Sequence, residues 1–83
     1  MLYNSIRESP DYPRGFSQRQ NGKTQNKINN KALFTMLRQL EPGKWKKIYS
    51  DGFDECGNRI SIHYFQSSSG KVFNVKVKLG WSN

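Results

Sequence analysis

Three runs rich in β-branched and aromatic residues fill the second half of this chain, at about residues 45–50, 59–66 and 71–79. Such residues are enriched in β-strands. The stretches between the runs, DGFDECGN and SSSG, are rich in turn-forming residues, and the second is short enough for a tight hairpin. Strands joined by short turns pair with their neighbours, so the sequence predicts an antiparallel β-meander.

One amphipathic helix is predicted immediately before these strands, at about residues 30–41. In KALFTMLRQL the apolar residues recur at three- and four-residue spacings, which places them on one helical stripe. An N-cap from the preceding Asn pair begins the helix, and Pro42 with Gly43 ends it. We therefore expect an α+β domain in which the helix covers one face of a three- to four-stranded meander and a basic sheet face stays open.

Residues 1–30 have a different character. They are rich in Asn, Gln, Ser, Arg and Lys, and they show almost no apolar periodicity. Residues 1–13 are predicted to be a flexible lead-in to a domain that spans residues 14–83. Within that domain, Phe16 and Ile28 could each dock on a core while the polar residues face a ligand, so we interpret this segment as a functional arm.

This chain of 83 residues can use neither of the two features that often stabilise small domains, disulfides and structural zinc sites. Its single cysteine, Cys56, allows no internal disulfide and no cysteine-rich zinc site. No run approaches the ~20 apolar residues that a membrane span needs, and the first residues lack the apolar core of a signal peptide. We expect one small domain, without a membrane partner, that is stabilised by packing or by another molecule.

Positive charge is concentrated in two blocks. The chain has 14 Lys and Arg against 6 Asp and Glu, for a formal charge of +8. Residues 12–40 and 58–83 contain no carboxylate, apart from the chain terminus. A polyanion could therefore meet positive charge from both parts of the chain. A basic surface also aids solubility, so both interpretations stay open at this point.

Side chains alternate across a strand, which sorts the last two predicted strands into an apolar and a polar set. The apolar set, expected to face the helix, is Ile60, Ile62 and Tyr64 in one strand and Phe73, Val75 and Val77 in the next. The opposite set is Arg59, Ser61, His63 and Phe65, followed by Val72, Asn74, Lys76 and Lys78.

His63 is the most informative member of the polar set. It is the only histidine in the chain, and its unperturbed pKa, about 6.5, lies near neutrality. Neighbouring cations should lower this pKa and favour the neutral base. A lone histidine is more often structural than catalytic, and it is the basic surroundings that favour a functional interpretation.

Other chemistries find less support in the sequence. The acids Asp51, Asp54 and Glu55 gather in one turn, where shaping the loop is the simpler interpretation than binding a cation. A cysteine nucleophile would need Cys56 beside His63 in space, and nothing in their spacing suggests it. We predict no metal site and no cofactor.

Metal-free RNA cleavage needs a base for the 2′-hydroxyl proton, cations for the phosphate and a proton source for the leaving oxygen. We expect His63 to act as acid or base, with Arg59, Lys76 and Lys78 around the phosphate. The second proton-transfer group is not identified. The candidate substrate-binding residues are Lys46, Lys47, Tyr49, Ser61, Lys71, Asn74 and Trp81. Aromatic rings among cations would equally suit a single-stranded nucleic acid.

Residues 14–83 resemble the C-terminal toxin modules of bacterial polymorphic toxins, including contact-dependent growth-inhibition proteins. The resemblance rests on the ordered combination of NGKTQNK, EPGKWKKIY, DGF, HYFQSSSGKVFNVKVK and a terminal GWSN. Such toxins often resemble ribonucleases of the barnase, colicin and RelE types, in which helices precede an antiparallel sheet whose open face cleaves RNA, frequently tRNA. The resemblance carries over no catalytic residue, and the glutamate of the Glu–His pair that barnase-like enzymes use has no counterpart in the last strands.

The resemblance implies a metal-independent ribonuclease toxin directed at RNA, with tRNA as the expected substrate. It also implies an acidic immunity protein as partner, and delivery as the tail of a larger secreted or cell-surface toxin that acts in the cytoplasm of a target cell. Two other classes stay open: a non-catalytic RNA- or DNA-binding module that uses the same basic face, and a protein-interaction domain with an acidic partner.

Overall fold

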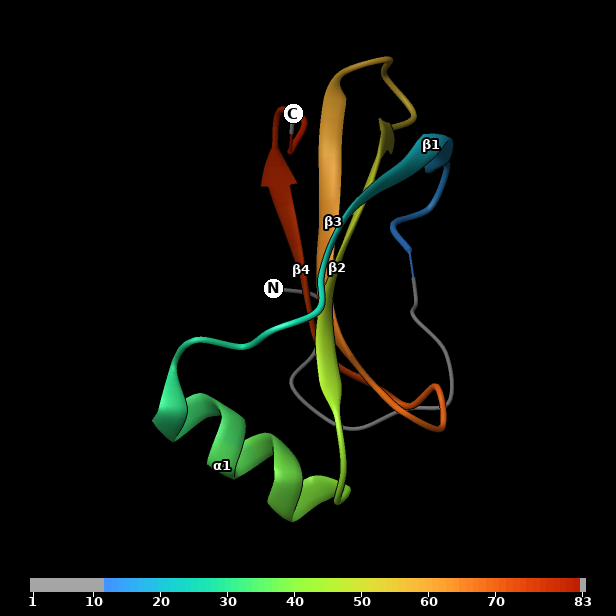
Figure 1. The fold of residues 1–83 in the computed structure, drawn as a ribbon. Helices are drawn as coiled ribbons and strands as arrows, with labels where there is room; N and C mark the ends of the chain where they lie inside the picture. The colour runs from blue at the N-terminus through green and yellow to red at the C-terminus, as the bar shows by residue number, and fades with distance from the viewer. Residues whose placement is uncertain (1–11, 83) are drawn as a thin grey trace.

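A computed structural model describes residues 12–82 of the chain as one helix and a four-stranded antiparallel sheet. The strand order is β1-β2-β3-β4, so every strand pairs with its neighbours in sequence (Figure 1). The elements are β1 (Ser17–Gln25), α1 (Lys31–Leu40), β2 (Trp45–Phe53), β3 (Arg59–Ser67) and β4 (Val72–Leu79). The predicted α+β class is confirmed. The predicted lead-in, residues 1–13, lies outside the described residues except for its last two.

Strand β1 forms where the sequence suggested an arm without regular structure. Its sequence, SQRQNGKTQ, has no apolar alternation. The strand forms through its backbone, because it lies at one edge of the sheet and pairs with β2 from Ser17 opposite Phe53 to Gln25 opposite Lys47. Two register shifts interrupt the ladder. An edge strand with polar side chains discourages pairing with other molecules, which is how natural sheets protect their edges.

Helix α1 is held at one end of the sheet rather than across it (Figure 1). The Asn30 side chain caps its first turn by accepting a hydrogen bond from the backbone N–H of Leu33, at 3.1 Å. At the other end, the Ser69 hydroxyl donates to Oε1 of Glu41 at 2.6 Å, and Trp45 Nε1 donates to the Glu41 carbonyl at 2.9 Å. These bonds fasten the helix end to the β3–β4 turn and to the start of β2.

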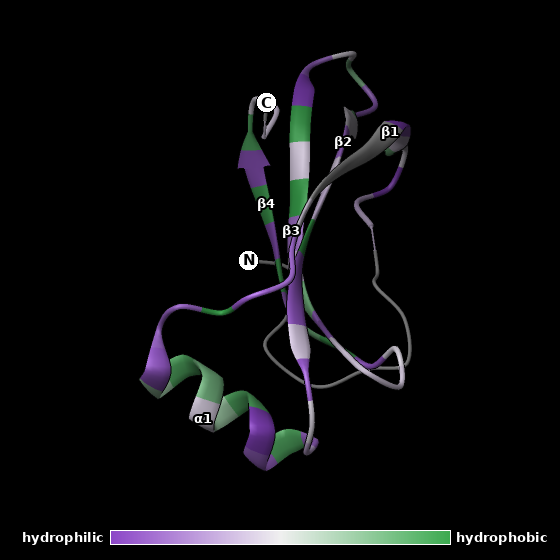
Figure 2. Cartoon of the chain, in the orientation of Figure 1, coloured by the Kyte–Doolittle hydropathy of each residue, from purple (hydrophilic) through white to green (hydrophobic). Residues whose placement is uncertain are grey.

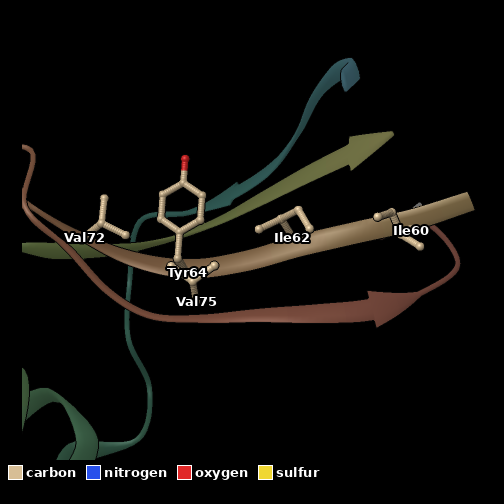
Figure 3. Close-up of a cluster of buried hydrophobic side chains, with 5 residues drawn as sticks. All are labelled: Ile60, Ile62, Tyr64, Val72 and Val75. Carbon is tan, nitrogen blue, oxygen red and sulfur yellow. The ribbon is translucent and has the colours of Figure 1, made fainter. Parts of the chain in front are cut away.

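Two separate clusters of buried side chains occupy the two faces of the sheet. Figure 3 shows the larger one, formed by Ile60, Ile62, Tyr64, Val72 and Val75. The second cluster joins Leu37 of the helix to Trp45, Phe65 and Phe73. The apolar residues of α1, green in Figure 2, therefore pack against aromatic rings and not against Ile60 and Ile62.

The helix thus packs on the sheet face that carries Phe65, which by alternation is also the face of His63. Our expectation that Ile60, Ile62 and Tyr64 would lie under the helix is wrong. The physical reason is that α1 is short and sits at the end of the sheet, where Trp45 and Phe65 supply large rings for its stripe to bury against.

A β-bulge at Asn74 changes the expected faces of β4. The β3–β4 ladder shifts register between the pairs His63–Lys76 and Phe65–Phe73, and Asn74 has a positive φ of 59°. One extra residue in a strand reverses the side-chain alternation beyond it. Phe73 therefore joins the helix-side cluster and Val72 joins the other one, opposite to the sequence prediction. Lys76 and Lys78 do share a face with His63, as predicted.

Within residues 12–82, no helix is long and apolar enough to cross a membrane.

The helix-side cluster yields a stability prediction. Leu37→Ala should lower the free energy of unfolding by about 2–5 kcal/mol, because Leu37 is fully buried and its truncation leaves a cavity. Leu40→Ala, the matched control, changes helix propensity equally at a side chain that is 40% exposed, and should cost about 1 kcal/mol or less. Urea unfolding followed by circular dichroism measures both. Equal losses would show that α1 does not pack through Leu37.

Candidate nucleic-acid site

Two rows of paired residues run across β2, β3 and β4 on the helix-side face. Tyr49 is opposite His63, which is opposite Lys76. Two residues further along each strand, Asp51 is opposite Ser61, which is opposite Lys78. Directly opposite residues share a face, so these rows bring together side chains from three strands on one surface.

A hollow of about 130 Å³ lies over these rows. Its lining consists of three lysines, two aromatic residues, an amide and the histidine: Lys47, His63, Tyr64, Phe65, Asn74, Lys76 and Lys78. We call it the His63 hollow. The sequence predicted His63, Lys47, Asn74, Lys76 and Lys78 as site residues, and the structure brings these five together.

The imidazole of His63 forms the half-buried centre of this hollow. Its ring lies against the ring of Tyr49, with centroids 4.4 Å apart. The Tyr49 hydroxyl donates a hydrogen bond to Oε1 of Gln25 at 3.4 Å, which links the ring to the β1 edge. Tyr49 therefore supports His63 from outside the hollow.

Two buried polar atoms of this hollow, Nε2 of His63 and Oδ1 of Asn74, have no hydrogen-bond partner among residues 12–82. Buried polar groups in proteins are nearly always paired, and an unpaired one costs free energy. Both atoms belong to residues that line the hollow, so a polar ligand bound close to His63 and Asn74 could complete their hydrogen bonding.

The surroundings of His63 favour its neutral form. Burial, together with the positive charges of Lys47, Lys78 and Lys76, lowers the pKa of His63 below its ordinary value, although the carboxylate of Asp51 acts in the opposite direction. A neutral imidazole at physiological pH can accept a proton, as a general base must.

Asp51 is a buried carboxylate near this site that sequence reasoning assigned to the β2–β3 turn. It lies within β2 and is fully buried. Burial raises its pKa, but the nearby hydroxyl of Ser61 and two hydrogen bonds from Ser82 outweigh burial, so that the pKa is lowered overall. Ser82 donates from its backbone N–H at 3.1 Å and from its hydroxyl at 2.8 Å. The signal that could have placed Asp51 near the site is its pairing with Ser61, because Ser61 is two residues from His63 in β3.

Four other predicted site residues lie away from the hollow: Arg59, Trp81, Lys71 and Lys46. A fifth, Ser61, is buried next to it. Arg59 and Trp81 contact each other at the end of the sheet where β3 begins, and they do not line the hollow. Lys71 lies near Glu41, whose pKa it helps to lower after the hydrogen bonds from Ser69 and Ser67. Ser61, only 1% exposed, lies beside Asp51.

Lys46 lines a larger hollow, of about 670 Å³, between α1, the segment before it and the ends of β2 and β3. Phe34 and Trp45 give this hollow an aromatic wall, and Lys27 and Lys44 add positive charge. Its lining contains no histidine, cysteine or carboxylate, so it offers a binding surface but no group suited to general acid–base catalysis at neutral pH.

Within the described part of the chain, no three His, Cys, Asp or Glu residues are grouped so that they could hold a metal ion. Asp54 instead organises the β2–β3 turn, where its Oδ1 accepts hydrogen bonds from the backbone N–H groups of Cys56 at 2.9 Å and Asn58 at 2.8 Å. This is the loop-shaping role that the sequence suggested for the acids of this turn.

Comparison of the chain with models of known protein families, with curated proteins and with solved structures found no match.

The charge environment of His63 can be tested by titration. Because the chain has one histidine, its imidazole gives a single titrating NMR signal, and the midpoint should lie below about 6.5. Lys47→Gln should raise the midpoint, because it removes the charge that depresses the pKa most after burial. Lys44→Gln, outside the hollow, should leave it unchanged. A wild-type midpoint at or above 6.5 would contradict the description of the site.

Proposed function

We propose that this protein is a metal-independent endoribonuclease whose active site is the His63 hollow. The observation that carries the proposal is a lone, half-buried imidazole in a small hollow lined by three lysines, where burial and the positive charges lower its pKa. An imidazole near neutral pH supplies general base catalysis, and lysines stabilise the charge that develops on a phosphate. These are requirements of RNA cleavage by the 2′-hydroxyl group.

The reaction begins when His63 accepts the proton of the 2′-hydroxyl group. The 2′-oxygen then forms a bond to the adjacent phosphorus, and the bond from phosphorus to the 5′-oxygen breaks. Lys47, Lys76 and Lys78 stabilise the additional negative charge of the pentacoordinate phosphate. The products are a 2′,3′-cyclic phosphate and a 5′-hydroxyl group, and no water molecule is consumed in this step.

The leaving 5′-oxygen needs a proton, and Lys76 is the group that we assign to this role. Lys76 is paired directly opposite His63 across β3 and β4, so base and acid would lie on the two sides of one phosphodiester. The ammonium group of a lysine is a hydrogen-bond donor that can reach a leaving oxygen. Tyr49 is the less suitable donor because its hydroxyl is directed to Gln25.

The substrate and the partner in this proposal come from the resemblance to toxin modules. The expected RNA is tRNA, cleaved in the cytoplasm of a target cell after delivery of the module as the tail of a larger toxin. An acidic immunity protein would complement the charge of +8 and block the hollow.

A non-catalytic nucleic-acid-binding module is the second candidate. It is favoured by the larger hollow, in which aromatic residues and lysines occur together without a catalytic group. That function would need the lysines of the surface but would not need His63.

Incubation with tRNA in EDTA separates the two functions. The wild type should cleave tRNA to fragments with 2′,3′-cyclic phosphate ends and leave DNA intact, because DNA lacks the 2′-hydroxyl group. His63→Gln should slow cleavage by about 100-fold or more, since it removes the base. Lys31→Gln, on α1 and outside both hollows, serves as the control for the loss of charge elsewhere.

Equal cleavage by His63→Gln and wild type would overturn the proposed mechanism. Salt-sensitive binding of tRNA without any cleavage would instead support the binding module.

A further inference from the structure

Two arginines approach one tryptophan at the end of the sheet where β3 begins. The guanidinium carbon of Arg19 is 4.3 Å from the centroid of the Trp81 ring, and that of Arg59 is 4.4 Å from it. Arg19 comes from β1 and Arg59 from β3, the strands on either side of β2. We call Arg19, Trp81 and Arg59 the arginine clamp.

The tryptophan of this clamp is held in a fixed position. Its Nε1 donates a hydrogen bond to the Gly52 carbonyl at 2.8 Å, and its ring meets Phe53 edge-on at 5.3 Å. The next residue, Ser82, is bonded to the buried carboxylate of Asp51. The two guanidinium groups therefore stack on a rigid support that is anchored to β2.

Stacking leaves the N–H groups of an arginine free to bind an anion. A guanidinium group that lies over an aromatic ring directs its five N–H donors outward in its own plane. Both arginines are exposed, and among residues 12–82 neither forms an ion pair with a carboxylate. Each guanidinium group can therefore offer paired N–H donors to a phosphate group.

The clamp lies on the course that a nucleic-acid strand would take out of the His63 hollow. Arg59 is four residues from His63 on the same face of β3, or about 13 Å along the strand. Lys78 lies between them in register, opposite Ser61. Lys78 thus provides positive charge between the hollow and the clamp, and Asp51, which lies in the same row of paired residues, is buried.

We propose that the arginine clamp is a second phosphate-binding site, which holds the backbone of the single-stranded RNA whose neighbouring phosphodiester occupies the His63 hollow. The proposal rests on the proposed function for the identity of the ligand. In this arrangement Trp81 supports the arginines, whereas the sequence suggested direct contact with the substrate. Arg59 binds substrate away from the reacting phosphate instead of stabilising it.

Binding of a single-stranded DNA oligonucleotide, which cannot undergo 2′-hydroxyl cleavage, tests the clamp. Fluorescence anisotropy over a series of NaCl concentrations gives the affinity and its salt dependence. Arg19→Gln and Arg59→Gln should each weaken binding several-fold and make the slope of log K against log[NaCl] shallower by about 0.7. In the Arg19→Gln/Arg59→Gln double variant, the slope should become shallower by about twice that amount.

Arg38→Gln is the matched control. Arg38 is an exposed arginine of α1 that also lies over an aromatic ring, at 5.7 Å from the Phe34 centroid. The Arg38→Gln substitution should leave the slope unchanged, because Arg38 lies on the helix and outside the clamp. Equal effects of the Arg38, Arg19 and Arg59 substitutions would overturn the proposal, since binding would then depend on total charge alone.

Trp81→Ala tests the support itself. It removes no charge, yet it should lower affinity several-fold because the arginines lose their fixed orientation. Thermal unfolding of each variant shows whether the fold is retained, and Trp81→Phe, which keeps a ring, should recover part of the affinity. Wild-type affinity of a folded Trp81→Ala variant would contradict a built phosphate site.

Failure of the clamp and failure of the nuclease proposal give different results. If RNA is cleaved but the clamp variants bind like Arg38→Gln, the clamp proposal falls alone. If the clamp variants bind weakly as predicted but RNA stays intact, the ribonuclease proposal falls and the clamp remains a phosphate-binding site for single strands.

Discussion

The β-bulge at Asn74 determines which side chains of β4 share a face with His63. If the β3–β4 ladder continued from the Phe65–Phe73 pair without a bulge, Lys76 would lie opposite Ile62, on the apolar face of the sheet. The extra residue, with its positive φ of 59°, shifts the register so that Lys76 lies opposite His63. The same shift keeps Phe73 on the helix side. One irregular residue thus provides both the aromatic cluster under α1 and the cationic surroundings of the imidazole.

The helix and the candidate site share one face of the sheet, and this limits the size of the site. The aromatic cluster with Leu37 occupies one end of that face, and Phe65 belongs both to this cluster and to the lining of the His63 hollow. At the other end, Ser82 binds Asp51 and Trp81 binds the Gly52 carbonyl. The hollow therefore lies between two fixed structures, the aromatic cluster and the segment that carries Trp81 and Ser82.

Local patterns in the sequence predicted the regular elements well. The helix, predicted at 30–41, spans Lys31–Leu40, and the last three strands form close to their predicted bounds. Strand β1 was missed because an edge strand needs backbone pairing rather than apolar alternation. Strict alternation also misplaced Phe73, since a single bulge reverses the faces beyond it. Alternation grouped His63 with Lys76 and Lys78, whereas the contribution of Asp51 depended on a cross-strand register that turn residues do not reveal.

The central claim is that a phosphodiester binds between His63 and the lysines of its hollow. The most direct measurement is the NMR titration of the His63 imidazole with and without a saturating, non-cleavable 2′-deoxy oligonucleotide. The account predicts that the bound phosphate raises the pKa of His63, because its negative charge favours the imidazolium form and offsets the lysines. An unchanged His63 pKa, with signals moving only around Phe34 and Trp45 of the larger hollow, would contradict the account.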